Sequence, residues 1–316
     1  MYSPSLAVLS KLHSFRSSPN HSMKRTSLLF AAFGLTAATA VAQSAFLPSE
    51  GELVATPGYL YSTYDKFWAG KTEVSVLKDN NASFDQHNGF VAFEYGLTPR
   101  IALDATVGYV YATTGHFTGF GRTSTDGLAD TSFGLRYLLV DGATKTDSWI
   151  PNVAVRAGGI AEGSYNVQYS APLNAGDGAS GVEGSLIASK VYSKLGTGYF
   201  AEIGFRHRAE RVQDDIFGSV GIFQEFSRIG LKGFSISVAY RQTEALSGGD
   251  IGGPGFGSTY GFPQVREISK AAEVGVAYTD AGRRSYQFTF AQKFDGRNTG
   301  EGSLFLFSIS LPLQLK

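Results

Sequence analysis

The chain has 316 residues with 27 basic and 27 acidic side chains, 39 glycines, 24 phenylalanines, 16 tyrosines and no cysteine. The lack of cysteine excludes a disulfide framework, thiol chemistry and a cysteine-ligated metal, and the balanced charge offers no basic surface for nucleic acid. Charged residues make up 17% of the chain, against about 25% in an ordinary soluble domain, which favours a membrane protein.

The first predicted element is a secretory signal peptide at residues 23–42. Lys24 and Arg25 precede an apolar run, and small residues follow up to Ala42. A basic start, an apolar middle and an Ala-x-Ala end are typical of a cleaved signal, and the run is shorter than the roughly 20 apolar residues of a spanning helix. We therefore expect cleavage after Ala42 and a single exported domain at residues 43–316.

The mature domain is expected to be mildly acidic. Residues 1–22 are interpreted as an extension without structural consequence, and removing residues 1–42 takes away four of the 27 basic side chains and none of the 27 acidic ones, for a net charge of about −4. No later segment is apolar enough for a spanning helix. If the mature chain enters a membrane, it must therefore do so as strands, which satisfy their backbone hydrogen bonds in lipid only in a closed barrel.

Alternation of apolar and polar side chains predicts strands, as in Phe234, Ile236 and Val238 against Ser235 and Ser237. Most of the alternating segments run 10 to 14 residues, whereas strands of soluble proteins average about 5–6 and strands that cross a bilayer need about 9–11. In chain order the twelve segments are residues 53–65, 86–95, 100–112, 127–139, 149–162, 180–192, 198–208, 215–226, 233–243, 268–278, 284–294 and 302–313.

The connections between these segments alternate along the chain between two kinds, short and long. Tight or middling connections occupy residues 96–99, 140–148, 193–197, 227–232 and 279–282. The alternate connections include the long ones at residues 66–85, 113–126, 163–179 and 244–267, although residues 209–214 and 295–301 are short. Short turns at one rim and long loops at the other are typical of outer-membrane barrels. We predict an all-β, transmembrane, antiparallel up-and-down barrel in the cell outer membrane, contacted by outer-membrane lipid and inserted by the barrel-assembly machinery.

The interior of such a barrel is expected to be narrow, since about eight strands enclose only side chains and sixteen or more leave a wide channel. Balanced charge argues against strong ion selectivity, and two roles stay open for the inward charges: mutual partners that stiffen the wall, or a constriction that contacts solute. The lumen-lining candidates are Glu94, Asp104, Asp130, Arg136, Arg156, Glu202, Arg206, Arg241, Glu273 and Lys293.

Catalysis is not expected. Only His87, His116 and His207 remain in the mature chain, and no serine stands in a Gly-x-Ser-x-Gly sequence, which argues against a hydrolase of the kind found among twelve-stranded outer-membrane phospholipases. The glycine-rich residues 248–261 lack the Lys-Ser/Thr of a phosphate-binding loop and are interpreted as an extracellular loop. We therefore predict no catalytic residues, no metal site and no cofactor.

The stretches YGLTPRI at residues 95–101 and TDGLADTSFGLRY at residues 125–137 resemble the outer-membrane family named for the meta-cleavage pathway of phenol degradation. Members are similar in a YGLT-type turn and a G-L-G-D-type strand start before G-L-R/K-Y; here Ala129 replaces the second glycine and Pro99 stands where a polar residue is expected. The resemblance is strongest over residues 90–139. It implies an envelope transporter of small aromatic or hydrophobic compounds and supplies no catalytic residues.

One departure concerns the last strand. The sequence ends in LQLK, where barrels usually present a terminal aromatic residue to the assembly machinery, and Phe305 and Phe307 are the candidates for that role. The leading functional hypothesis is a narrow passive channel or transporter for small solutes. The alternatives are a non-transporting structural or adhesive barrel that acts through its long loops, and a soluble periplasmic β-protein.

Overall fold

The structure is a computed structural model that describes residues 44–119, 123–142, 148–167, 173–209 and 212–315. The predicted extension and signal peptide lie outside the described residues, so the boundary at Ala42 stays a prediction. No helix in the described part of the chain is long and apolar enough to cross a membrane.

The described residues are almost entirely strand. In chain order the elements are β1 (Glu52–Ala69), β2 (Thr72–Val74), α2 (Val76–Asp79), β3 (Phe84–Thr98), β4 (Ile101–Thr113), β5 (Ser124–Leu128), β6 (Thr131–Val140), β7 (Asn152–Ala161), β8 (Gly181–Tyr192), β9 (Thr197–Arg208), β10 (Asp215–Glu225), η2 (Ser227–Ile229), β11 (Phe234–Ala245), η3 (Phe262–Gln264), β12 (Ile268–Thr279), β13 (Ser285–Arg297) and β14 (Gly300–Gln314).

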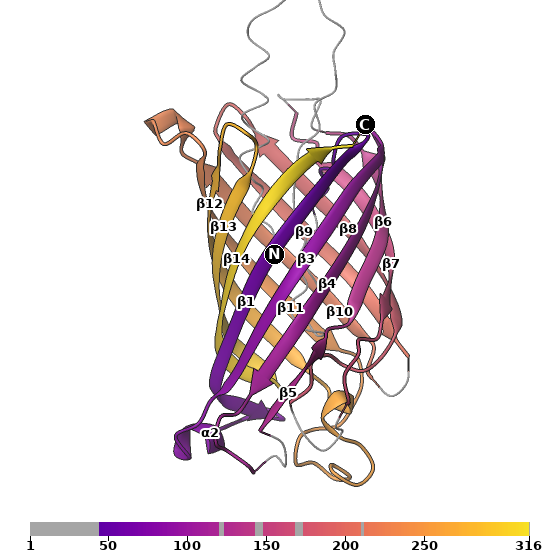
Figure 1. Cartoon of the computed structure of the whole chain (residues 1–316), viewed down its shortest axis with the longest axis vertical. Coiled ribbons are helices and arrows are strands. Elements are labelled where there is room, and N and C mark those ends of the chain that lie inside the picture. Colours follow the sequence, from indigo (N-terminus) through magenta and orange to yellow (C-terminus); the bar gives the residue numbers. More distant parts are fainter. Residues whose placement is uncertain (1–43, 120–122, 143–147, 168–172, 210–211, 316) are drawn as a thin grey trace, which may run out of the picture.

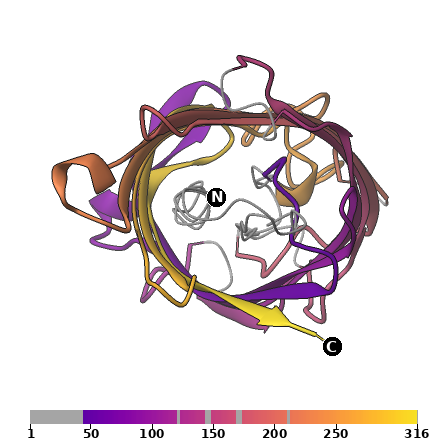
Figure 2. The same cartoon turned by 90° about the horizontal axis from the view of Figure 1, so that it is seen from above.

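Twelve of these strands form a closed antiparallel barrel, and β2 and β5 are additional short strands. Each barrel strand pairs with its neighbour in sequence, and β14 pairs back to β1 from Glu52↔Gln314 to Phe67↔Gly300. The strands tilt strongly around the cylinder (Figure 1), and the view along its axis shows a complete ring (Figure 2). The predicted fold class is confirmed, and all twelve predicted segments are strands.

Side chains alternate between the two faces of the wall because successive residues of a strand point to opposite sides. On β11, Val238 is 51% exposed on the outer face while Ser237 beside it is 7% exposed on the inner face. The outer face carries apolar side chains on every side of the barrel, for example Phe133, Ile203, Ile222, Phe288 and Phe307. In β8 and β10 the apolar residues Val182, Leu186, Val220 and Ile222 also point outward.

The segment predicted as one strand at residues 127–139 is two strands, β5 and β6, separated at Ala129 and Asp130. Gly127 has φ of 156°, which favours glycine. The carboxylate of Asp130 accepts hydrogen bonds from the backbone N–H groups of Gly163 and Asp177. The interruption between β5 and β6 therefore lies where Asp130 binds the backbone of the loop between β7 and β8.

The long connections gather at one rim. β1 continues beyond its predicted end into a hairpin with β2, and α2 follows it. Leu77 of α2 packs in an apolar cluster with Phe84, Val110 and Leu173, which come from β3, β4 and the loop before β8. The loops of this rim are thus packed against the barrel mouth. The opposite rim holds the tight turns, as predicted.

Candidate functional site

A band of alternating charges crosses the inner wall from β3 to β10. Distances from guanidinium nitrogen to carboxylate oxygen are 2.9 Å for Arg136–Glu94 and 3.7 Å for Arg136–Asp104. Arg156 lies 2.7 Å from Asp104 and also contacts Glu183. Arg206 lies 3.2 Å from Glu183 and 3.4 Å from Asp215. We call these seven residues, Glu94, Asp104, Arg136, Arg156, Glu183, Arg206 and Asp215, the charge ladder.

The ladder contains five of the ten predicted lumen residues, and the other five lie elsewhere. Arg241 and Glu273 form a separate buried pair on β11 and β12 at 2.9 Å. Glu202 is buried on β9, Asp130 belongs to the mouth, and Lys293 of β13 donates to the Thr299 hydroxyl at 3.2 Å. All ten lie on the inner face or at the mouth of the barrel. That any of them contacts a solute stays a prediction.

The remaining inner wall divides into two further sectors by chemistry. Buried hydroxyl residues of β10 to β13 form a hydroxyl sector: Ser219, Ser235, Ser237, Ser269, Thr279, Ser285 and Thr289. Buried apolar residues of β14, β1 and β3 form an apolar sector: Val54, Leu60, Phe90, Leu304 and Leu306. They alternate with the buried polar residues Thr56, Gln86, Asn88 and Ser308. Leu60 faces Leu306 across the closing strand pair. Interiors of outer-membrane barrels are usually polar, so the apolar sector is a distinctive feature of this wall.

An N-terminal strap, residues 44–50, lies inside the ring of strands at the tight-turn rim (Figure 2, indigo). The carbonyl oxygen of Ser44 accepts a hydrogen bond from Arg136 at 3.0 Å, and the Ala45 backbone is bound by Asn152 and Ser189. Leu47 packs in an apolar cluster on the same side of the wall. The described part of the strap therefore narrows the lumen over β6, β7 and β8.

The opposite end of the lumen carries a mouth cluster made of Asp130, Tyr165, Asp177 and Arg208. The Tyr165 hydroxyl donates to Asp130 at 2.5 Å, and Arg208 lies 2.8 Å from the Asp177 carboxylate. Burial raises the pKa of Asp177, and the positive charge of Arg208 opposes that rise. Burial and the charge of Asp130 raise the pKa of Tyr165, so it stays a protonated hydrogen-bond donor. The cluster fastens the loop before β8 to the wall.

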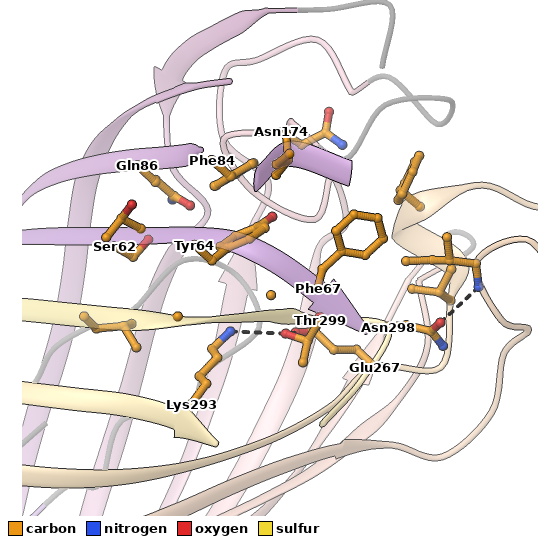
Figure 3. A pocket seen from close by; sticks show the side chains of 18 of the residues that line it. Ser62, Tyr64, Phe67, Phe84, Gln86, Asn174, Glu267, Lys293, Asn298 and Thr299 are labelled. Carbon is orange, nitrogen blue, oxygen red and sulfur yellow. Dashed lines mark hydrogen bonds between the residues drawn. The ribbon is translucent and has the colours of Figure 1, made fainter. Parts of the chain in front are cut away.

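A pocket of about 210 Å³ opens beside this cluster, between β1, β13, β14 and the loop before β12. Tyr64, Phe67, Phe84 and Phe262 line its aromatic side. Lys293, Thr299 and Glu267 line its polar side (Figure 3). Tyr64 and Phe84 are stacked with ring centroids 4.6 Å apart. Leu304, the residue of the apolar sector nearest the mouth, also lines the pocket, so the pocket and that sector are continuous.

Asn298 holds the outer edge of the pocket together. Its side-chain oxygen accepts from the backbone N–H groups of Gly70 at 2.7 Å and Ile251 at 3.0 Å. Its amide donates to the Asp250 carboxylate at 2.9 Å and the Arg266 carbonyl at 2.8 Å. Asn298 has φ of 51°, a left-handed conformation that asparagine tolerates better than most residues. One residue of a tight turn thereby links two loops.

Apart from Lys293, the residues that line the pocket were not among the predicted sites. Tyr64 and Phe84 lie close to predicted strand ends, where aromatic residues are expected for the membrane interface, and strand parity would have turned both to the inside. Glu267 and Asn298 lie in connections, where period-two alternation carries no information. Their convergence depends on how the loops fold back over the rim.

The histidines give no support for catalysis. His87 lies on the outer face near the start of β3, and its ring stacks on that of Tyr61 with the ring centroids 5.0 Å apart. His207 is exposed on the outer face and lies 2.9 Å from Asp214. Among the described residues no group of three or more histidine or carboxylate side chains is arranged to hold a metal ion.

Comparisons with known proteins support the fold. No protein-family model matches the chain, and no curated protein matches it. The chain is similar to the structure of an outer membrane channel from Pseudomonas putida F1, with 11% identity over 93% of this chain and 100% of that one and a TM-score of 0.65. It is also similar to the KdgM porin (9% identity, 81% of this chain and 97% of that one, TM-score 0.43). A third is the translocator domain of the autotransporter NalP from Neisseria meningitidis (10% identity, 85% and 90%, TM-score 0.46).

The first of these likenesses and the closed cylinder with its apolar outer face give the same result: by fold, the chain is an outer-membrane β-barrel. The predicted location in the outer membrane is therefore confirmed. The phenol-degradation family is not confirmed and stays a prediction.

Proposed function

We propose that the protein is a passive outer-membrane channel for small solutes, aromatic and other hydrophobic molecules included. The observation that carries this proposal is the apolar sector, which lies along one side of the interior from the mouth pocket at Leu304 to Val54 near the tight-turn rim. These side chains are packed within the wall and are at most 8% exposed, and a hydrophobic solute that passes along them gains about 25 cal/mol for each Å² of its own apolar surface that it buries. Likeness to a known channel and the resemblance to the phenol-degradation family support the same function.

The charge ladder, the hydroxyl sector and the apolar sector have different roles in the inner wall. In the charge ladder each ion has an opposite charge beside it, so the ladder stiffens the wall and leaves little net field to select ions. The strap covers that same side near the tight-turn rim. A solute path along the apolar and hydroxyl sectors then runs beside the ladder and meets it at Glu94, which lies opposite Val54. A planar molecule with one polar group would meet apolar contacts on β14, β1 and β3 and hydroxyl groups on β10 to β13.

The test uses the absence of native cysteine in this chain. Leu306→Cys places a thiol on the inner face of β14, and Phe307→Cys places one on the outer face of the same strand. In planar bilayers a cationic methanethiosulfonate reagent should reduce the single-channel conductance of the first variant and leave the second unchanged. Equal responses would contradict the path, and purified protein that never conducts would favour the adhesive or structural alternative.

Solute class is tested in liposomes. L-phenylalanine and L-serine are both zwitterions that cross lipid slowly, so their entry reports on the protein. Phenylalanine is larger than serine, so a plain water-filled pore would admit it more slowly. We expect liposomes that contain the protein to swell in phenylalanine faster than this difference in size predicts. Swelling that follows size alone would remove the aromatic preference and leave a general pore.

A further inference from the structure

The mouth pocket has the size of a site for one aromatic ring. Its volume is about 210 Å³, whereas an apolar cavity of about 150 Å³ already binds benzene. The pocket therefore has room for a ring with one small substituent. Concave sites lined by apolar and aromatic side chains with a few polar groups are the usual form of small-molecule sites.

The aromatic side of the pocket is fixed in place. Tyr64 stacks on Phe84 with an angle of 12° between the ring planes. Its other neighbour is the backbone of β14, since a Cβ atom added at Gly300 would lie 2.5 Å from Tyr64 Cδ1. A ring held from two sides loses little freedom when a ligand packs against its edge, and edge-to-face aromatic pairs contribute about 0.5–1.5 kcal/mol beyond the area they bury.

The polar side is a chain of hydrogen bonds with a defined direction. Lys293 Nζ donates to Thr299 Oγ1 at 3.2 Å, and Thr299 Oγ1 donates to Glu267 Oε1 at 2.8 Å (Figure 3). A hydroxyl group has one proton, so Thr299 accepts from the lysine and donates to the carboxylate. The chain ends in an ammonium donor on one side and a carboxylate acceptor on the other. Such a pair matches a ligand group that both accepts and donates, such as an amide or a hydroxyl.

The charges of the pocket disfavour an anionic ligand. Its charged side chains are Lys293, Glu267 and Asp177, and Arg208 lies 2.8 Å from Asp177. Burial raises the pKa of Glu267, the Asp177 charge adds to the rise, and Lys293 opposes it. Negative charge is already unfavourable at this place, so a ligand carboxylate beside Glu267 would meet repulsion in a site of low dielectric.

We propose that the mouth pocket binds uncharged one-ring aromatic molecules that carry an amide or a hydroxyl group, and that it discriminates against aromatic carboxylates. The ligand ring packs against the aromatic side and the edge of Tyr64, and the polar group bridges Lys293 and Glu267. The inference rests on the proposed channel function, because it makes the pocket the place where the solute is captured before it meets the apolar sector.

The experiment compares benzamide with benzoate, two ligands of nearly equal shape that differ in charge. Binding to the purified full chain in detergent micelles is measured by calorimetry and saturation-transfer NMR. Benzamide should bind at least about tenfold more tightly than benzoate, a difference of about 1.4 kcal/mol. Glu267→Gln keeps the shape and removes the acid, so it should bring the two dissociation constants close together. Equal affinities in the unaltered chain, or a ratio that Glu267→Gln leaves unchanged, would overturn the proposal.

Two variants test the aromatic side. Tyr64→Leu should weaken benzamide binding by about tenfold, and Tyr61→Leu, which changes the same residue type on the outer face of the same strand, should leave it unchanged. Gly300→Val removes no pocket side chain but pushes the Tyr64 ring into the cavity, and it should weaken binding at least as much as Tyr64→Leu does. Benzamide binding that survives both Tyr64→Leu and Gly300→Val would place the ligand elsewhere and contradict the assignment.

Conductance of the same preparations separates this proposal from the channel function. A chain that conducts ions but does not bind benzamide would overturn the pocket assignment alone. A chain that binds benzamide with the expected charge discrimination but never conducts would support the pocket and overturn the channel.

Discussion

At the scale of single residues, Arg156 is the centre of the charge ladder. Its guanidinium donates to Asp104 and to Glu183, and only 4% of its side chain is exposed. Gly134 and Gly158 flank it: a Cβ atom at Gly134 would lie 2.8 Å from Arg156 Cζ, and one at Gly158 would lie 2.9 Å from Arg156 Nη1. Glycine at these positions leaves room for a guanidinium to lie across the wall. The sequence places arginine on the inner parity, whereas the structure shows why its neighbours are small.

Arg156→Gln is expected to destabilise the barrel by about 3–5 kcal/mol, because removing one partner of a buried ion pair leaves uncompensated charge. Two acids, Asp104 and Glu183, would then lose a shared cation. The measurement is the urea midpoint of unfolding in lipid vesicles. Arg284→Gln, which removes the exposed partner of Asp280 at a tight turn, serves as the control and should leave the midpoint unchanged. Equal shifts for the two variants would show that the ladder is not a stabilising network.

At the scale of elements, the strap explains a glycine in the YGLT motif. A Cβ atom at Gly96 would lie 2.1 Å from the carbonyl oxygen of Ser49, so the strap crosses β3 where no side chain stands. The Gly51 N–H also donates to the Gly96 carbonyl at 2.8 Å. The motif therefore marks a crossing point of two segments as well as a turn.

Gly96→Val should displace the strap and raise the single-channel conductance, because the added side chain and the Ser49 carbonyl cannot occupy the same space. The matched control is Gly89→Val on the same strand, where a Cβ atom meets nothing within 4 Å. We expect the control to conduct like the unaltered chain. A conductance that Gly96→Val leaves unchanged would show that the described strap does not restrict flow.

The mouth cluster is expected to respond to pH. Burial raises the pKa of Asp177 above its ordinary value of about 4. An acid with a raised pKa takes up a proton more readily in the docked loop than in the free one. Docking is therefore most stable below about pH 4 and weakens as pH rises through the raised pKa.

Hydrogen exchange measures this effect after correction for the intrinsic pH dependence of exchange. The N–H of Gly178, which donates to Tyr165 in the docked loop, should lose protection as pH rises, and Asp177→Asn should flatten the response. The N–H of Arg208 is an internal control, since it lowers the pKa of Asp214 by donating to it at 2.9 Å. Its protection should instead be lost on acidification. Parallel behaviour of the two amides would contradict the assigned directions.

At the scale of the whole molecule, the closed cylinder has hydrocarbon outside and a crowded lumen inside. Val238→Arg should cost about 2–4 kcal/mol if the position lies near the bilayer midplane, because the charge would face lipid. Ser237→Arg points into the lumen and should change conductance more than stability. Unfolding midpoints in vesicles and single-channel currents measure the two effects. Equal losses of stability would mean that the faces of β11 are reversed.

Strand parity predicted most of this architecture, because a lipid-facing wall forces a period of two on every strand and leaves long alternating segments. The same parity turned Glu94, Arg136 and Arg206 to the inside. It could not predict which charges pair, since ion pairs form between strands whose register depends on turn geometry. It also could not predict the mouth pocket, whose polar side joins Glu267 and Lys293 through a loop that folds back over the rim.

The seam between β1 and β14 differs in origin from the other pairings of the cylinder. Those others join strands that follow one another along the chain, while this one joins Glu52 to Gln314 and Leu60 to Leu306. Until the last strand arrives, the growing sheet has two open edges, each able to recruit a foreign strand. The barrel therefore cannot be finished in stages. During insertion the free edge of β1 must stay covered until β14 pairs with it. Loss of β14 would leave an open sheet rather than a smaller cylinder.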